Sequence, residues 1–241
     1  MRRFLVIRLA SPLIAFGGEA IDNLGVIRDF PALSMLTGLF ANALGWDRSE
    51  AERHNRLQQR LCMGCVLAPG GQRVQDFQTA QLGKDDKGWT SWGMPEERAG
   101  GAGTYAGPHL RWRDYHADLC AWVAVALQPA DEAPTLDDIA AALDRPARPL
   151  FIGRKPCLPA GRLVAGWQHA RDTREALQAI VTSHHAGTPA TAWRAQWPEG
   201  EGVQPGDRLL DLCDQRNWDS GVHGGWRPVR QGLLHPVEAS A

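Results

Sequence analysis

The first residues of the chain alternate between apolar and polar side chains, and a helical period follows. The run RFLVIRL, residues 3–9, has the period-two spacing that is typical of a β-strand. After a segment rich in turn residues, Pro31 stands at the favoured first position of a helix. Apolar residues then recur at helical spacing, at Leu33, Leu36, Leu39, Phe40 and Leu44. The pattern therefore predicts a first strand and a first helix.

The middle of the chain continues with helices and strands in a recognisable order. Ser49 is placed to cap a second helix that reaches about residue 61. Two strand-like pieces, residues 62–67 and 73–77, are separated by Gly70 and Gly71, which indicate a hairpin turn. The elements that follow are a long apolar strand in HADLCAWVAVALQP, a helix capped by Thr135, a capped helix in DTREALQAIVTSHH and a β-rich remainder. This order predicts an α+β fold of the ferredoxin-like kind.

Residues 78–110 interrupt the pattern. They hold seven glycines and two prolines and sustain no apolar period. Because loops longer than about a dozen residues in compact domains are usually functional or disordered, this insertion needs a physical reason. Trp89, Trp92 and Trp112 lie in or beside it, and aromatic rings next to arginine are what base stacking uses. Plain packing of these rings is the alternative interpretation.

The net charge favours no partner, but the distribution of charge is uneven. The 241 residues include 26 Lys and Arg and 27 Asp and Glu, whereas a free-standing nucleic-acid binder usually has a basic surplus. Residues 145–171, however, hold six Arg or Lys and no acid. Within them RPLFIGRKPCLP, residues 148–159, places Arg154 and Lys155 side by side on chain stiffened by prolines. Such segregation can form one basic face on a neutral molecule, although solvated surface charge is an alternative.

The cysteines and the N-terminus narrow the class of protein. Five cysteines at irregular spacing argue against a secreted disulfide framework. Cys62 and Cys65 form a single C-x-x-C without a second ligand pair, so structural thiols are expected rather than a metal site. Arg8 and Pro12 interrupt the candidate signal peptide, and no apolar run approaches the ~20 residues of a membrane span. We therefore expect a cytoplasmic protein with no metal, no cofactor and no membrane contact.

Motifs for catalysis are scarce. The chain has no G-x-S-x-G, no P-loop, no dinucleotide-binding glycine pattern after a strand and no H-E-x-x-H. Tyr115 and His116 stand next to Arg113, and a histidine beside a cation could support metal-independent RNA cleavage. A half-buried histidine beside an apolar strand is the simpler interpretation. A generic protein-interaction module is a further alternative.

Five segments resemble, in order, successive motifs of the Cas-five family of CRISPR-associated proteins, and in particular its type I-E Cascade members. They are RLASPLIAFG, RDFPALSMLTGLFANALG, DFQT, WRDYHADL and FIGRKPCLP. The resemblance is strongest over residues 3–45, 111–128 and 148–159 and is weak after about residue 185. Five motifs in the family's order at fitting separations are a specific signal.

The resemblance implies a non-catalytic RNA-binding scaffold. The implied fold has a ferredoxin-like (RNA-recognition-like) core, residues 1–77 and 111–150, with an inserted thumb, residues 78–110, and a β-rich part, residues 151–241. Such a subunit grips the 5′ handle of the CRISPR RNA, caps the filament of the backbone subunit CasC and contacts the large subunit CasA. It meets target DNA through the complex, and another subunit cuts the precursor RNA.

The resemblance also implies which residues contact RNA. They are Arg8, Phe16, Arg28, Ser34, Arg111, Trp112, Arg113, Arg154 and Lys155. Ser34 lies at the start of the Pro31 helix, whose free N–H groups and positive dipole end suit phosphate. Arg154 and Lys155 match a basic pair of the family, on a rigid loop that limits the entropy lost on binding.

Two positions depart from the family's pattern. Leu33 stands where the family has an arginine, and Asp29 adds a negative charge. We therefore expect fewer RNA contacts from this segment and expect Arg28 to carry more of the binding. Base-edge contacts, which distinguish the handle from other RNA, are expected in the loop around Phe16 and in the thumb.

Overall fold

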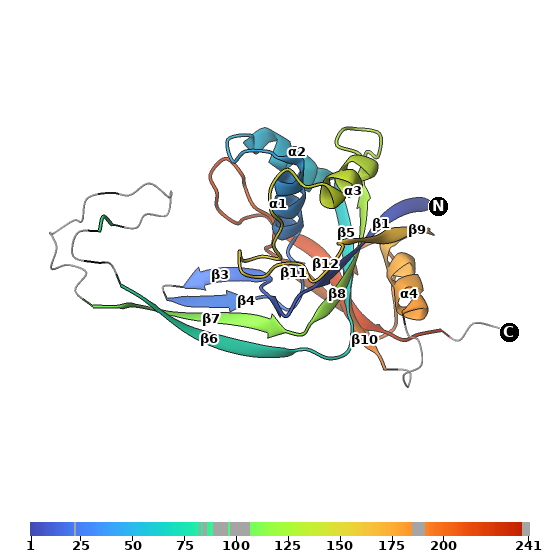
Figure 1. The fold of residues 1–241 in the computed structure, drawn as a ribbon. Coiled ribbons are helices and arrows are strands. Elements are labelled where there is room, and N and C mark those ends of the chain that lie inside the picture. Colours follow the sequence, from blue (N-terminus) through green and yellow to red (C-terminus); the bar gives the residue numbers. More distant parts are fainter. Residues whose placement is uncertain are drawn as a thin grey trace.

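The computed structural model describes residues 1–21, 23–81, 83, 86–88, 96, 107–184 and 191–237. Within them, two β-sheets and four helices form a mixed α/β fold (Figure 1). The strands are β1 (Arg2–Ala10), β2 (Leu13–Ile14), β3 (Gly17–Ile21), β4 (Leu24–Ile27), β5 (Leu61–Leu67), β6 (Gln72–Ala80), β7 (His109–Ala117), β8 (Cys120–Leu127), β9 (Val164–Ala170), β10 (Trp193–Pro198), β11 (Arg208–Leu212) and β12 (Arg227–Leu234). The helices are α1 (Leu33–Leu44), α2 (Ala51–Arg60), α3 (Leu136–Asp144) and α4 (Thr173–Ser183). No helix of these residues is long and apolar enough to cross a membrane.

The larger sheet has seven strands in the order β11-β12-β10-β5-β8-β1-β9, and its neighbouring strands pair antiparallel. Strands from the last third of the chain join both edges, because β9 pairs with β1 and β10 pairs with β5. The β-rich remainder that the sequence predicts is thus confirmed as strands β10, β11 and β12, which belong to the same sheet as the N-terminal strands.

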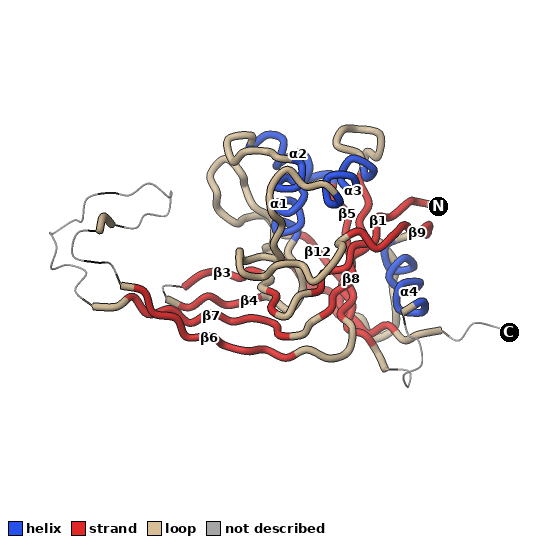
Figure 2. Tube along the Cα trace, viewed as in Figure 1, coloured by secondary structure: helices blue, strands red, loops and turns tan. Residues whose placement is uncertain are grey.

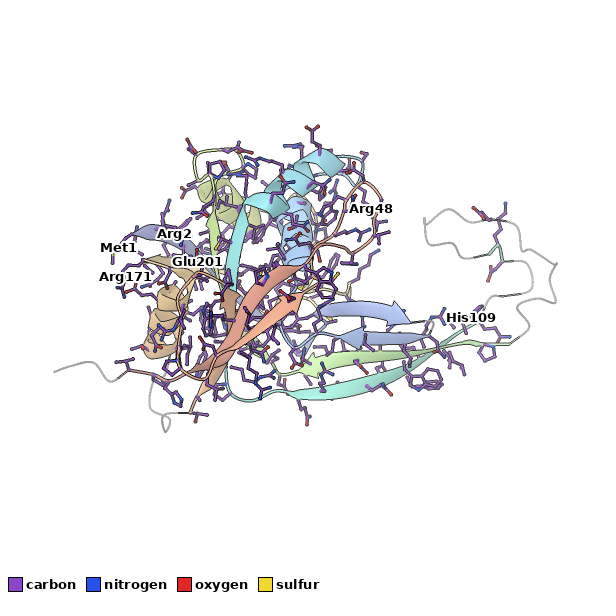
Figure 3. All side chains as sticks on the ribbon, turned by 180° about the vertical axis from the view of Figure 1, so that it is seen from behind. Met1, Arg2, Arg48, His109, Arg171 and Glu201 are labelled. Atoms are coloured by element: carbon purple, nitrogen blue, oxygen red, sulfur yellow. The ribbon has the colours of Figure 1, made fainter. Side chains whose placement is uncertain are left out.

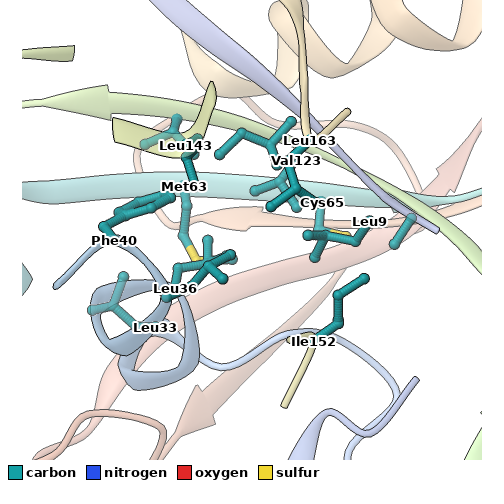
Figure 4. Close-up of a cluster of buried hydrophobic side chains, with 14 of the residues drawn as sticks. Leu9, Leu33, Leu36, Phe40, Met63, Cys65, Val123, Leu143, Ile152 and Leu163 are labelled. Atoms are coloured by element: carbon teal, nitrogen blue, oxygen red, sulfur yellow. The ribbon is translucent and has the colours of Figure 1, made fainter. Parts of the chain in front are cut away.

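Helices cover both faces of this sheet. Alternate residues of β1 go to opposite faces: Leu5 and Ile7 are buried with α1 and α3, whereas Phe4 and Val6 are buried with α4. Figure 4 shows side chains of α1, with Leu36 among them, next to the β5 side of the core. The apolar face that the sequence predicts for the first helix is therefore confirmed.

The smaller sheet projects from this body (Figures 1 and 2). Its order is β2-β7-β4-β3, with β6 paired along the other side of β7. Nearly all of β6 is exposed, so the projection is held by strand pairing more than by a core. Most of the predicted insertion, with Trp89 and Trp92, lies outside the described residues.

Two helix caps are confirmed. The Thr135 hydroxyl accepts from the Asp138 backbone N–H, and the Asp138 carboxylate accepts from the Thr135 N–H, which is a capping box at α3. Asp172 caps α4 by accepting from the Glu175 N–H at 2.8 Å. The predicted Ser49 cap is wrong, because α2 begins after Glu50, whose side chain does not cap it.

The predicted hairpin between the two strands of residues 62–77 is wrong. β5 pairs with β8 and β10 in the larger sheet, whereas β6 pairs with β7 in the smaller one. Gly70 and Gly71 have φ values of 107° and 75°, and they redirect the chain from one sheet to the other. The predicted long strand of residues 116–129 is divided in the same region, because Asp118 has φ 54° between β7 and β8.

The five cysteines are free thiols, as the spacing predicts. Cys62 packs beside the α4 face of the larger sheet, and Cys65 is buried on the α1 face. Burial raises the pKa of both thiols. No group of three or more His, Cys, Asp or Glu among the described residues is placed to hold a metal ion.

Candidate nucleic-acid interface

Two arginines that are distant in sequence converge where the smaller sheet leaves the body. Gly25 of β4 pairs with Arg113 of β7. A Cβ on Gly25 would lie 2.8 Å from Arg154 Nη2 and 3.1 Å from Arg113 Nη1, so both guanidinium groups lie over this glycine. Lys155, next to Arg154, is exposed. We call Arg113, Arg154 and Lys155 the cation cluster.

Residues 148–159, the braced loop, are fixed to the body at several points. Arg154 donates to the carbonyl oxygens of Asp114 (2.7 Å) and Gly25 (2.6 Å), and its guanidinium lies 4.9 Å from the Tyr115 ring centroid. Gly153 has φ 85°, and a Cβ there would lie 1.7 Å from the Ala15 oxygen. Arg154 therefore ties the loop to β4 and β7, in addition to carrying charge.

The charges of the cation cluster are not neutralised within the described part of the chain. Arg154 contacts carbonyl oxygens rather than carboxylates, and neither Arg113 nor Lys155 forms an ion pair there. Asp76 stands opposite Arg113 in the strand register, but its carboxylate accepts from Gln78 Nε2 at 2.6 Å. Arg111, two residues along the same face of β7, donates to the Leu110 carbonyl oxygen at 3.0 Å.

Trp112 lies on the other face of β7, because neighbouring strand residues point in opposite directions. Its ring is 5.2 Å from that of Phe77, which is 54% exposed. The smaller sheet therefore has a cationic face with Arg111 and Arg113 and an aromatic face with Trp112 and Phe77. Phe77 was missed by the sequence analysis, which treated the DFQT segment only as part of a motif.

The phosphate site predicted at the start of the first helix stays a prediction, but an acid of the same chain lies at this position. The helix begins at Leu33 rather than Pro31, and the Leu33 N–H donates to Asp214 Oδ2 at 3.0 Å. The Ser34 N–H donates to the Asp214 carbonyl oxygen at 3.0 Å, and Ser34 itself is buried. Asp214 is 1% exposed and is held by Arg227 through two hydrogen bonds, of 2.8 and 2.7 Å.

Three further predicted residues lie elsewhere. Phe16 is fully buried, 5.5 Å from the His116 ring, so its side chain is not available to stack on a base. Arg28 is half-buried and donates to the Cys213 carbonyl oxygen at 2.9 Å. Arg8 is exposed on the α4 face of the larger sheet, 5.8 Å from the Trp122 ring, whereas the braced loop packs into the core on the α1 face.

The residues considered for RNA cleavage do not form a catalytic group. Tyr115 and His116 are 3% and 8% exposed, and they point to opposite faces of β7. His116 Nε2 is 2.9 Å from the Arg28 carbonyl oxygen, and burial lowers the pKa of this histidine. Neither side chain is open to a substrate in this fold.

Comparisons with known proteins agree with the architecture. Among curated proteins, the chain is 24% identical over 206 residues to "CRISPR system Cascade subunit CasD" of Escherichia coli (strain K12), across 77% of this chain and 85% of the relative. Among solved structures, it is similar to a chain of a "CRISPR RNA-guided surveillance complex", with a TM-score of 0.69 and 23% identity over 97% of this chain and 90% of that one. A "Crystal structure of Cas protein" gives a TM-score of 0.58 and 20% identity over 96% and 95%.

The family comparison covers nearly the whole fold. A family model described as "CRISPR-associated protein (Cas_Cas5)" matches residues 4–230, from the first strand into β12. The matched region includes both sheets, the braced loop and the cation cluster. The chain therefore belongs to the Cas5 family of CRISPR-associated proteins.

Proposed function

We propose that this chain is a non-catalytic RNA-binding subunit of a type I-E Cascade surveillance complex and that it grips the 5′ handle of the CRISPR RNA. Family membership and the likeness to a Cascade subunit support the assignment. The observation that carries it is the cation cluster, because Arg113 and Arg154 meet over Gly25 and no carboxylate among the described residues neutralises them.

The order of the strands and helices in the larger sheet supports this function. With the strands of the smaller sheet left out, the elements follow one another as β1–α1–α2–β5–β8–α3–β9, and β5-β8-β1-β9 are neighbours in an antiparallel sheet. This agrees with the β-α-β-β-α-β order of the ferredoxin-like, RNA-recognition-like core that we propose. The projecting β6 and β7 form the base of the proposed thumb. The cation cluster thus lies where the thumb meets the core.

The arrangement suits a phosphate backbone. The Arg154 guanidinium is held by two carbonyl oxygens and an aromatic ring, so little conformational entropy is lost when an anion binds beside it. Arg113 and Lys155 offer donors and charge to phosphate oxygens. Trp112 and Phe77 on the opposite face of the thumb can contact bases that leave the stack.

The subunit acts by holding other molecules in place. It caps one end of the CasC filament, contacts CasA and meets target DNA through the assembled complex. The burial of Tyr115 and His116 supports a non-catalytic role, because the residues considered for cleavage cannot reach a phosphodiester.

Co-purification tests the proposal. Tagged protein, expressed with the other subunits and a CRISPR array, should bring down guide RNA that begins with the repeat-derived handle, together with CasC and CasA. Arg113→Ala combined with Lys155→Ala should reduce the recovered RNA. Recovery of unrelated RNA, or of none, would contradict the function. Labelled repeat RNA incubated with the purified chain in EDTA should stay intact, and a product that disappears with His116→Ala would establish the nuclease instead.

A further inference from the structure

A second cationic region lies beside α1, away from the strands of the thumb. A groove of about 630 Å³ runs between α1, the segment that follows it, the braced loop and the segment between β11 and β12, residues 213–226, which we call the C-terminal loop. Its charged lining residues are Asp47, Arg48, Arg148 and Arg216, with His54. Three arginines therefore face one carboxylate.

The single carboxylate that lines the groove, that of Asp47, already forms an ion pair. Asp47 Oδ1 accepts from Arg148 Nη2 at 2.6 Å, and the other terminal nitrogen of Arg148 donates to the Trp46 carbonyl oxygen at 2.8 Å. Arg48 is exposed and makes no hydrogen bond or ion pair with any described residue. Figure 3 shows Arg48 beside the C-terminal loop.

Arg216 is more buried than Arg48, the other arginine that Asp47 does not pair with. It is half-buried, and its guanidinium lies 5.2 Å from the Trp218 ring centroid. The Trp218 ring lies 4.5 Å from that of His54 and rests on Gly38 of α1. Gly221, with φ 74°, leaves room for the guanidinium, because a Cβ there would lie 3.0 Å from Arg216 Nη2. The Arg216 Nε is buried and has no hydrogen-bond partner among the described residues.

The C-terminal loop is itself fixed to the helices, so Arg216 has a defined place. Gln58 of α2 donates to the Arg216 carbonyl oxygen at 3.0 Å and accepts from the Arg216 N–H at 3.1 Å. Asn55 accepts from the Trp218 N–H at 3.1 Å and donates to Asp219 at 2.7 Å. A loop of this length that is held so firmly is typical of a functional segment.

Arg48 and Arg216 repel each other. Burial, and secondarily the charge of Arg48, lowers the pKa of Arg216. Two guanidinium groups in one groove, with the nearby acid already paired, are unfavourable until an anion lies between them. A phosphate is the anion that best matches two planar forks of N–H donors.

We propose that this groove binds one phosphate of the single-stranded RNA backbone, with Arg48 and Arg216 as its two ligands. This rests on the proposed RNA-binding function and extends it to a second contact point, between the segment that follows α1 and the C-terminal loop. Gly153 of the braced loop lines the same groove, so the strand can pass from the cation cluster into it. The aromatic rings orient Arg216 rather than stack on a base, because His54 and Arg216 already lie against Trp218.

A double-mutant cycle tests the groove. The affinity of purified protein for fluorescent handle RNA is measured from about 50 to about 200 mM salt, and the slope should fall by about 0.7 when one phosphate contact is lost. Arg48→Ala and Arg216→Ala should each weaken binding about fivefold, and the double variant should be little worse than either, because both ligands hold the same phosphate. Arg208→Ala is the matched control and should bind normally, because Arg208 is an exposed cation on β11 that forms no ion pair with the described residues.

Two further variants distinguish a loss of RNA binding from a loss of folding stability. Arg48→Glu changes an exposed residue and should weaken binding more than Arg48→Ala while leaving the unfolding temperature unchanged. Arg216→Lys keeps the positive charge but lacks the planar set of N–H donors of a guanidinium group. It should therefore bind RNA more tightly than Arg216→Ala and more weakly than the wild type. Normal RNA binding by the Arg48→Ala/Arg216→Ala protein would overturn the groove proposal, even if that variant assembled poorly with partner proteins. Loss of binding in Arg113→Ala/Lys155→Ala would then still support the RNA-binding function, whereas normal binding in both would overturn the function as well.

Discussion

The N-terminus of α1 and the cation cluster both carry positive charge, but they differ in what neutralises it. At α1 the first N–H groups donate to Asp214, and Arg227 in turn pairs with that acid. At the cation cluster Arg154 is held by carbonyl oxygens, and Arg113 and Lys155 have no ion pair among the described residues. The first region uses its positive charge for folding, whereas the charge of the second is available to the RNA that we propose it binds.

The difference shows that a favourable local motif is not yet a binding site. A helix N-terminus attracts any anion, and a buried aspartate of the same chain competes with a phosphate for it. Arginines that lie over backbone carbonyl groups are ordered without being neutralised. A candidate site for an anionic ligand is therefore one where cations are held in place but are not paired with an acid of the same chain.

The largest expected effect is on stability at α1. Asp214→Ala removes the buried anion from the helix N-terminus and leaves the half-buried Arg227 without its carboxylate partner, so the free energy of unfolding should fall by about 3 kcal/mol. Urea titration measures this, with Asp211→Ala, an exposed acid of β11, as the control. A variant as stable as the wild type would show that Asp214 does not stabilise the fold, and tighter binding of handle RNA would show that the N-terminus of α1 is a phosphate site.

The next effect is on RNA binding at the cation cluster. Arg113→Ala with Lys155→Ala should weaken handle binding at least about tenfold, since hydrogen bonds to charged groups contribute about 1.5 to 3 kcal/mol each. The salt slope should fall by about 1.4, close to 0.7 for each lost phosphate contact. Arg154 is left intact because its removal would also loosen β4 and β7. Arg8→Ala, on the α4 face, should bind normally, and a loss there equal to that of the double variant would contradict the comparison.

A smaller effect comes from geometry without a change of charge. Gly25→Ala would place a methyl group 2.8 Å from Arg154 Nη2 and 3.0 Å from Arg113 Cδ, which displaces the ends of both side chains. We expect about threefold weaker RNA binding and a small fall in the unfolding temperature, because a displaced Arg154 loses its hydrogen bond to the Gly25 carbonyl oxygen. Gly17→Ala on β3, where a Cβ would meet nothing within 4 Å, is the control. Unchanged affinity in Gly25→Ala would show that the positions of the two guanidinium groups do not matter.

The smallest effect is the pH dependence at Asp29, a third region where charge is neutralised internally. Hydrogen bonding by Arg194, helped by Arg73, holds the pKa of Asp29 below its usual 3.8. The carboxylate therefore stabilises the fold above that pH, and this contribution is lost as the pH falls through the lowered pKa. Unfolding free energies of the wild type and Asp29→Asn, compared from about pH 5 to about pH 3, should converge in acid. Unfolding free energies that differ by the same amount at every pH would show that Asp29 does not contribute to the acid sensitivity of the fold.

Much of the fold follows from local patterns, and the errors lie where distant segments meet. The first strand, the apolar face of α1 and the caps of α3 and α4 depend on residues close in sequence, and they are confirmed. The hairpin at Gly70 and Gly71 is wrong because two glycines indicate a turn but not the strand that the chain pairs with next. That partner, β7, is set by the pairing of residues 72–80 with residues 109–117.

The candidate site was foreseen in part for the same reason. Arg113 and Arg154 were named because each matches a motif, but their meeting over Gly25 joins three segments that no local pattern connects. Asp214 is 181 residues from Leu33, so nothing near the helix start announces that the position is filled. Phe16 has an aromatic side chain that could stack on a base, but tertiary packing buries it fully.

Photo-crosslinking tests the central claim most directly. Handle RNA that carries 4-thiouridine is irradiated in the assembled complex, and the linked peptides of this chain are identified by mass spectrometry. The account predicts crosslinks in β7 around residues 111–113 and in the braced loop, residues 148–159. Crosslinks confined to the α4 face around Arg8, with none at the cation cluster, would contradict it.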